Sequence, residues 1–377
     1  MKRNMMAKRM ATAMLTGMMT MSMGMNAFAV VTGAEQNTGA DAATKVQIKK
    51  TVTTDGKTFA PNATFGFTIE EGEGSAATAT SPAIKAGVGV EDIVIGTVGF
   101  TSDSDLALLS SSYSGYANID VSQVSYATPG IYHYVIKESI PEDNLKVKGV
   151  VYDETAKDIY VYVERDADAN VVKAVVSSTD DGAKAASIDF VNNYGEEGTG
   201  KEDQVFDTTV YKKVTGNQGD RTAKYDFTLR ITSPDDSKYF IVEVPGTDAD
   251  DRIVVKANEE KTISLGDTES FTINGLVEGE SYTVTEKSYA DMGYATFVEQ
   301  GQYTDETYSK TDKTEKNTID QTADGIALGN DVVYTVINDN NVTTPTGIIL
   351  TFAPYVLMIA AAGIFAVMFL RKKREEF

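Results

Sequence analysis

Short stretches in which hydrophobic and polar residues alternate recur from residue 46 to residue 338. Val46, Ile48 and Val52 follow this pattern, and residues 159–163 and 171–176 form hydrophobic runs on either side of a polar turn. An alternation with a period of two places every second side chain on the same face of a β-strand. Because no long segment with helical periodicity interrupts these stretches, the sequence predicts an all-β protein made of Ig-like β-sandwiches.

Three motifs occur twice along the chain, in the same order. They are Ile48-Lys49-Lys50-Thr51-Val52 with Val210-Tyr211-Lys212-Lys213-Val214, Tyr134-Val135-Ile136-Lys137-Glu138 with Tyr282-Thr283-Val284-Thr285-Glu286, and Phe190-Val191-Asn192 with Val336-Ile337-Asn338. A repeat of this kind indicates two copies of one domain. We therefore expect an N-terminal β-sandwich at residues 44–195, a Gly- and Glu-rich linker at 196–206, and a C-terminal β-sandwich at 207–340.

Each copy places polar residues on the hydrophobic face of its strands. In the first copy these residues are Lys50, Glu138 and Asn192, and in the second they are Lys212, Glu286 and Asn338. Burying a lone ammonium group costs several kcal/mol, so a buried lysine tends to become neutral and thereby nucleophilic. A buried, protonated glutamate can polarise the asparagine carbonyl and transfer protons.

This chemistry predicts that each lysine attacks its asparagine and forms an isopeptide bond with loss of ammonia. The two glutamates would assist a reaction that occurs once in each domain, so we do not expect an enzyme that turns over a substrate. The alternative is a buried Lys–Glu salt bridge with the asparagine only hydrogen-bonded. A completed bond between the first and last strands would carry tension past the rest of the domain.

Both ends of the chain resemble targeting segments. Residues 1–29 combine basic residues, a Met- and Ala-rich core and an Ala27-Phe28-Ala29 cleavage motif, as in a secretory signal peptide, and residues 30–43 would form a leader. At the other end, residues 341–377 contain Pro345-Thr346-Gly347, an uncharged apolar run at 348–370 and a basic tail. A helix of this length can cross a bilayer of about 30 Å, with its basic end in the cytoplasm.

Composition excludes several classes of function. The formal net charge of −21 disfavours nucleic acid as a partner. The chain has a single histidine and lacks cysteine, so we expect neither a metal site nor a cofactor. The spacing of Asp166, Asp168 and Asn170 suits a calcium loop, but Val171 stands where such a loop needs glycine, and we interpret the segment as a solvated turn.

The order of Pro-Thr-Gly, apolar run and basic tail resembles a Gram-positive cell-wall sorting signal, which sortase transpeptidases cleave between threonine and glycine. The alternative is a plain membrane anchor. Over residues 45–347 the chain resembles the major (backbone) pilins of the streptococcal T-antigen type. This resemblance rests on the repeated Lys, Glu and Asn motifs together with Pro61-Asn62, Phe65-x-Phe67, Pro129-Gly130-Ile131-Tyr132 and Gly219-Asp220-Arg221.

The resemblance implies a pilus shaft subunit with two CnaB-type domains, exported to the Gram-positive cell wall. It implies bonds Lys50–Asn192 and Lys212–Asn338, assisted by Glu138 and Glu286, and sortase cleavage between Thr346 and Gly347. The partners would be a pilus-class sortase, further copies of the chain, minor pilins and peptidoglycan, with membrane contact only through the helix at 348–370 before cleavage.

Polymerisation also needs an acceptor amine on the next subunit. Lys184 occupies the place that the resemblance gives to this lysine, although it lies one residue further from Asn192 than in the family pattern, and Lys201 in the linker is the second candidate. A different function, a monomeric wall-anchored adhesin, fits the same domains but would produce no covalent polymer.

Overall fold

The computed structural model describes residues 31–38, 44–177, 184–195, 205–246, 251–303, 314–322, 332–341 and 357–368. These residues are predominantly β-strands, so the all-β prediction is confirmed. The predicted signal peptide, Lys201 and the Thr346–Gly347 cleavage site lie outside the described residues. Among the described strands, no sheet combines members from both halves of the chain, and we refer to β1–β13 and β14–β23 as the N-terminal and C-terminal domains.

In the N-terminal domain two sheets contain the residues of interest. One has the order β13-β2-β8, and the other has the order β12-β11-β10-β4, with β5 beside β10. The strands are β1 Val31–Thr32, β2 Gln47–Thr54, β3 Ala63–Phe65, β4 Phe67–Glu71, β5 Ile84–Ala86, β6 Val94–Ile95, β7 Val98–Phe100, β8 Ser112–Ala117, β9 Ile119–Asp120, β10 Gly130–Glu138, β11 Ala156–Asp166, β12 Ala169–Ser177 and β13 Ser187–Tyr194. Short 3-10 helices lie at Val90–Asp92, Leu106–Leu108 and Asp143–Leu145.

The C-terminal domain has a sheet β17-β16-β19-β14-β23-β21 and a second sheet β18-β15-β20-β22. Its strands are β14 Phe206–Thr215, β15 Tyr225–Thr232, β16 Tyr239–Glu243, β17 Arg252–Lys256, β18 Glu260–Leu265, β19 Ser270–Leu276, β20 Ser281–Glu286, β21 Ala295–Gln300, β22 Thr318–Thr322 and β23 Val332–Asp339, with a 3-10 helix at Ala290–Met292. A cluster of buried hydrophobic side chains fills each domain, as expected for sheets that pack face to face, and the N-terminal cluster extends to Ile241 and Val277 of the C-terminal domain.

The first and last long strands of each domain are parallel neighbours. Strand β2 pairs with β13 so that Lys50 lies opposite Phe190, and β14 pairs with β23 so that Lys212 lies opposite Val336. In both cases the asparagine is two residues further along the last strand. The chain therefore enters and leaves each domain on adjacent strands that run in the same direction, and tension along the chain shears this pair.

Two predicted boundaries differ from the structure. Phe206, which we expected in the linker, is the first residue of β14, where it pairs with Leu276 and is buried because its ring fills the C-terminal core. In the predicted leader, Val31 and Thr32 form strand β1 and pair with Phe100 and Gly99 of β7. The leader thus contributes an edge strand to the N-terminal domain.

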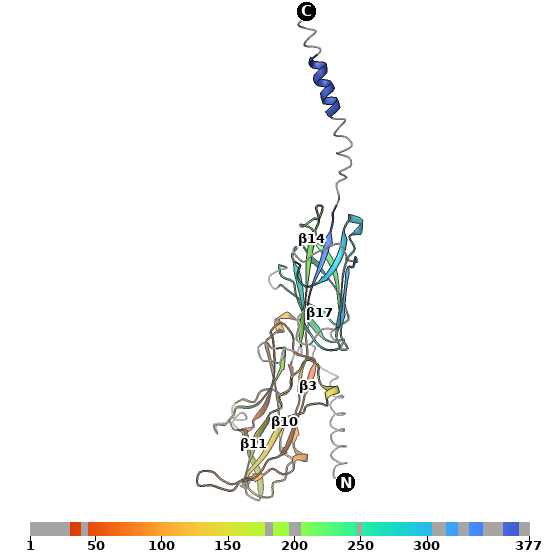
Figure 1. Ribbon diagram of the computed structural model, residues 1–377. Coiled ribbons are helices and arrows are strands. Elements are labelled where there is room, and N and C mark those ends of the chain that lie inside the picture. The colour runs from red at the N-terminus through yellow and green to blue at the C-terminus, as the bar shows by residue number, and fades with distance from the viewer. Residues whose placement is uncertain are drawn as a thin grey trace, which may run out of the picture.

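The two domains lie end to end, with β3 and β17 near their junction (Figure 1). Polar contacts cross this junction: Asn62 Nδ2 donates to Asp235 Oδ2 (2.6 Å), and the Tyr239 N–H donates to Ser102 Oγ (2.9 Å). Gly149 lies here with φ +82°, and a Cβ on it would come within 2.6 Å of the Tyr194 ring and within 2.7 Å of Val277 in the C-terminal domain. The close approach of the domains therefore requires glycine at this position.

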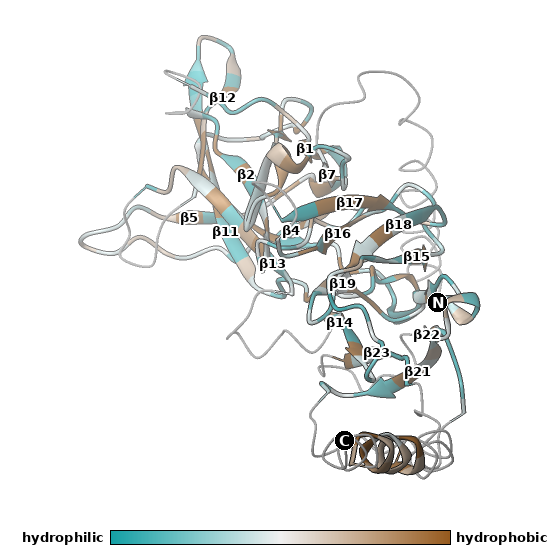
Figure 2. Cartoon of the chain, turned by 90° about the horizontal axis from the view of Figure 1, so that it is seen from above, coloured by the Kyte–Doolittle hydropathy of each residue, from teal (hydrophilic) through white to brown (hydrophobic). Residues whose placement is uncertain are grey.

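An α-helix at residues 357–368 falls within the apolar segment expected at 348–370, and its residues are hydrophobic (Figure 2). In the part of the chain that the structure describes, no helix combines the length and the apolar character that crossing a membrane requires. The membrane span at 348–370 stays a prediction.

Candidate functional site

Lys50, Glu138 and Asn192 meet in the core of the N-terminal domain. They come from β2, β10 and β13, and each is at most 5% exposed. Lys50 Nζ lies 2.7 Å from Glu138 Oε2, and Asn192 Nδ2 donates to Glu138 Oε1, also at 2.7 Å. One carboxyl group therefore holds both the amine and the carboxamide.

The C-terminal domain repeats this arrangement with Lys212 on β14, Glu286 on β20 and Asn338 on β23. All three are buried. Here a single oxygen, Glu286 Oε1, lies 2.9 Å from both Lys212 Nζ and Asn338 Nδ2. Glu286 Oε2 is buried without a hydrogen-bond partner among the described residues, which suits a carboxyl group that carries its proton there.

Burial controls the ionisation of both Lys–Glu pairs. Desolvation lowers the pKa of Lys50 despite the opposing attraction of Glu138, and it lowers the pKa of Lys212 to about 8. Desolvation also raises the pKa of Glu138 and of Glu286, against the attraction of the neighbouring lysines. Both shifts favour a neutral amine beside a protonated acid, which is the state in which lysine is a nucleophile.

An aromatic ring lies beside each amine. Lys50 Nζ is 5.0 Å from the centroid of the Phe65 ring, and Lys212 Nζ is 4.8 Å from that of Tyr225. Two residues further along each chain segment lies a phenylalanine that is the cross-strand partner of the glutamate: Phe67 pairs with Glu138, and Phe227 pairs with Glu286. Tyr225 was not predicted to lie at this site, although the match of Tyr225-Asp226-Phe227 to Phe65-Gly66-Phe67 is a signal that identifies it.

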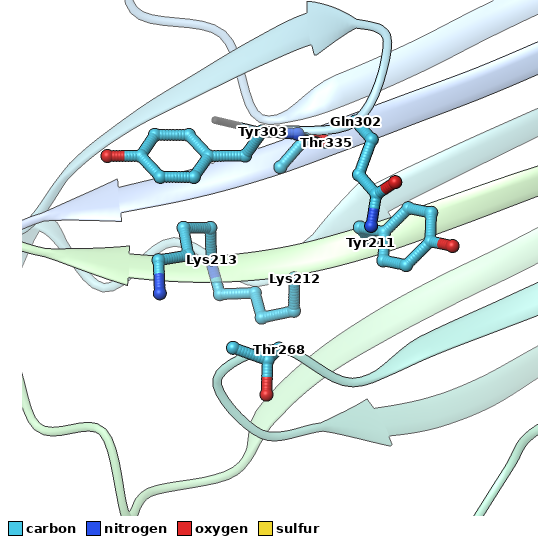
Figure 3. Close-up of a pocket in the computed structure, with 7 residues that line it drawn as sticks. All are labelled: Tyr211, Lys212, Lys213, Thr268, Gln302, Tyr303 and Thr335. Atoms are coloured by element: carbon cyan, nitrogen blue, oxygen red, sulfur yellow. Dashed lines mark hydrogen bonds between the residues drawn. The ribbon is translucent and has the colours of Figure 1, made fainter. Parts of the chain in front are cut away.

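A pocket of about 250 Å³ lies on the surface near Lys212. Tyr211, Lys213, Thr268 and Tyr303 are among its lining residues (Figure 3). Lys213 pairs with Asp267 here (3.3 Å). Lys212 is itself a lining residue although its side chain is fully buried, whereas neither Glu286 nor Asn338 lines the pocket.

The predicted acceptor, Lys184, is exposed and lies outside both clusters. It comes just before β13, where the Ala185 N–H donates to the Ser177 carbonyl oxygen of β12 (2.9 Å). The neighbouring residues 178–183 lie outside the described residues. Lys184 thus belongs to the same domain as Asn192 and is accessible to a second protein.

Comparisons with known proteins give family relations for both domains. Residues 46–195 match a family described as the Spy0128-like isopeptide containing domain, and residues 207–339 match a domain of unknown function, DUF7601. A curated relative named "Pilin", from Streptococcus pyogenes serotype M1, is 29% identical over 266 residues, which are 68% of this chain and 72% of the relative.

The fold also matches solved structures. The crystal structure of the major pilin from Streptococcus pyogenes is similar with a TM-score of 0.56 and 24% identity, over 79% of this chain and 99% of that one. The T3.2 major pilin from Streptococcus pyogenes serotype GAS13637 gives a TM-score of 0.54 and 22% identity, over 83% and 100% of the two chains. Residues 46–195 thus match the Spy0128-like isopeptide containing domain, and the chain is similar in sequence to a streptococcal pilin and in fold to streptococcal major pilins.

Proposed function

We propose that this protein is a pilin, the repeating subunit of a covalent pilus shaft on the surface of a Gram-positive cell. Each of its two CnaB-type Ig-like domains is braced by a bond that the domain forms itself, Lys50–Asn192 in one and Lys212–Asn338 in the other. The observation that carries the proposal is the pair of buried clusters in which one glutamate contacts both an amine and a carboxamide.

The position of the bonds fits a load-bearing role. Lys50 and Asn192 lie on adjacent parallel strands, as do Lys212 and Asn338, and these are the strands by which the chain enters and leaves each domain. In the C-terminal domain this link takes up the shear along the shaft, because tension that enters through β14 leaves through β23; in the N-terminal domain, where tension enters at Lys184, the link fastens β2 to the strand that carries the load. It also closes a loop of well over 100 residues, which in chain-entropy terms resembles a disulfide worth about 4–5 kcal/mol.

Mass spectrometry of the purified soluble region, residues 30–346, tests the bonds. Two completed bonds make the protein lighter than its sequence by two ammonia molecules. Glu138→Ala and Glu286→Ala should each restore the mass of one ammonia, because each removes the group that activates the carboxamide and accepts the proton of the amine. A wild-type mass equal to that of the unmodified sequence contradicts the proposal.

Assembly is the second part of the proposal. A pilus-class sortase cuts between Thr346 and Gly347 and transfers the Thr346 carbonyl carbon to Lys184 of the next subunit, with minor pilins and peptidoglycan as the other partners. Lys184 supports this role because it is exposed and lies beside the strand that carries Asn192.

The test is the ladder of high-mass species on denaturing gels of cell-wall extracts. Lys184→Ala should abolish the ladder, whereas Lys261→Ala, at an exposed position of the C-terminal domain, should leave it intact. If Lys201→Ala abolishes the ladder and Lys184→Ala does not, the linker lysine is the acceptor. A single band from the wild type favours the monomeric adhesin instead.

A further inference from the structure

In both clusters the carboxamide oxygen of the asparagine has its own hydrogen-bond donor. Thr296 Oγ1 donates to Asn338 Oδ1 across 2.9 Å, and the Asp153 backbone N–H donates to Asn192 Oδ1 across 2.8 Å. We propose that these two groups are the oxyanion donors of the cross-linking reactions, which hold the negative charge that develops on the carboxamide oxygen as lysine attacks. This inference rests on the bonds proposed above and assigns a role to residues beyond the Lys–Glu–Asn triads.

The strand pairing fixes the donor in the C-terminal domain. Thr296 on β21 is the direct cross-strand partner of Asn338 on β23, and it is buried. The carboxamide is thereby held at both ends, with its nitrogen on Glu286 and its oxygen on Thr296. The carbon between them is thus oriented before the amine reaches it, and such preorganisation is what makes an oxyanion donor effective.

The N-terminal domain places a different group at the same position. The segment that contains Asp153 runs beside β13, since Val151 forms a bridge with Asn193, and it takes the place that β21 occupies beside β23. Asp153 Oδ2 also accepts the Val191 N–H (3.0 Å), which holds this segment against the last strand. A strand hydroxyl in one domain and a loop amide in the other thus present one donor each to the equivalent oxygen.

The reaction balances with these groups alone. Lys212 gives one proton to Glu286, and the neutral Nζ attacks Asn338 Cγ to form a C–N bond. The oxygen of the tetrahedral intermediate, Oδ1, becomes an oxyanion against the Thr296 hydroxyl. Glu286 then gives its proton to Nδ2 and takes the second proton from Nζ, the carbonyl reforms, the bond from Cγ to Nδ2 breaks, and ammonia departs. The products are one secondary amide, one ammonia and a protonated Glu286.

Thr296→Val tests the assignment because valine keeps the shape of threonine and removes the donor. The full chain is made by cell-free synthesis and quenched at intervals. After proteolysis, mass spectrometry then quantifies two cross-linked peptide pairs, one containing Lys212 and Asn338 and the other containing Lys50 and Asn192.

We expect the C-terminal bond to form about 100-fold more slowly in Thr296→Val. The N-terminal bond, whose donor is a backbone amide, should keep its rate, and Thr296→Ser should recover most of the C-terminal rate.

Two controls separate chemistry from folding. Thr335→Val removes another buried hydroxyl, one that donates to the Gly301 carbonyl oxygen, and it should leave the bond rate unchanged. In a Glu286→Ala background, where the bond cannot form, adding Thr296→Val should shift the thermal unfolding midpoint no more than Thr335→Val does.

The remaining outcomes contradict either the oxyanion assignment or the proposed C-terminal bond. A wild-type rate in Thr296→Val, or equal slowing of both bonds, overturns the oxyanion assignment and leaves the proposed bonds standing. A wild-type chain that never forms the C-terminal pair overturns the proposed bond itself.

Discussion

Lys238 Nζ donates a hydrogen bond to Tyr194 Oη across 3.3 Å, and this contact joins the C-terminal domain to the last strand of the N-terminal domain. The same amine contacts both oxygens of Glu280, at 2.8 and 3.0 Å. Burial opposes the charge of Lys238, but the attraction of Tyr194 and Glu280 outweighs it and raises the pKa of the amine. The pKa of Lys238 is thus raised where those of Lys50 and Lys212 are lowered, and its cluster contains a tyrosine where theirs contain an asparagine.

Tyr194→Phe should weaken the junction between the domains. The substitution removes the acceptor for the Lys238 ammonium while the ring remains, and hydrogen bonds to charged groups contribute about 1.5–3 kcal/mol. We expect a loss of that size in the free energy of unfolding, measured with guanidinium chloride. Tyr162→Phe, at a position that is 39% exposed, should change it by less than about 0.5 kcal/mol. Equal effects of the two substitutions contradict the prediction.

Two glutamates of one turn, Glu278 and Glu280, should differ in how much stability the protein loses when each is changed to glutamine. Glu280→Gln leaves the buried Lys238 ammonium without its counter-charge and should cost about 3–5 kcal/mol. Glu278 also pairs across the junction, with Lys148 at 2.6 Å, but both side chains are about half exposed. Glu278→Gln should therefore cost less than about 1 kcal/mol. Thermal unfolding of both variants measures this difference. Similar losses of stability in the two variants contradict the prediction that the buried pair contributes more.

Formation of the C-terminal bond should depend on pH with a bell-shaped profile. The reactive pair holds one proton between Lys212 and Glu286. Below the raised pKa of Glu286 the pair carries two protons, and the amine is a non-nucleophilic ammonium ion. Above the pKa of Lys212, which burial lowers to about 8, the pair carries none, and Glu286 has no proton for the leaving nitrogen. Rates from the cell-free time course at several pH values test this, and a rate that still rises beyond pH 9 contradicts the alkaline limb.

Loss of one bond should destabilise one domain. Asn338→Ala removes the electrophile but leaves the Lys212–Glu286 pair in place, so the loss measures the cross-link more directly than a change at the glutamate. We expect the free energy of unfolding of the C-terminal domain to fall by about 4–5 kcal/mol. Differential scanning calorimetry should show this in one transition only, and Asn192→Ala should shift the other. A fall of under about 1 kcal/mol means that the cross-link does not constrain the unfolded chain.

Much of each cluster could be predicted from the sequence because strand alternation is local. The side chain of every second residue lies on the same face whatever the strand pairs with, so Ile48 and Val52 on the core side place Lys50 there too, and the structure has all three buried. The same reasoning applies to Glu138 beside Ile136 and to Asn338 beside Val336. The recurrence of the three residue types in one order then indicated that they meet.

Strand neighbours and the junction were decided by tertiary structure, because they depend on packing between residues far apart in the chain. Nothing local to β2 shows that β13 lies beside it in parallel. Thr296 and Asp153 reach the carboxamide oxygens only because β21 and the loop at Val151 pair with the last strands. Lys238 likewise looks like an ordinary surface lysine in the sequence. It is buried because Tyr194 and Glu280 enclose it where the two domains meet.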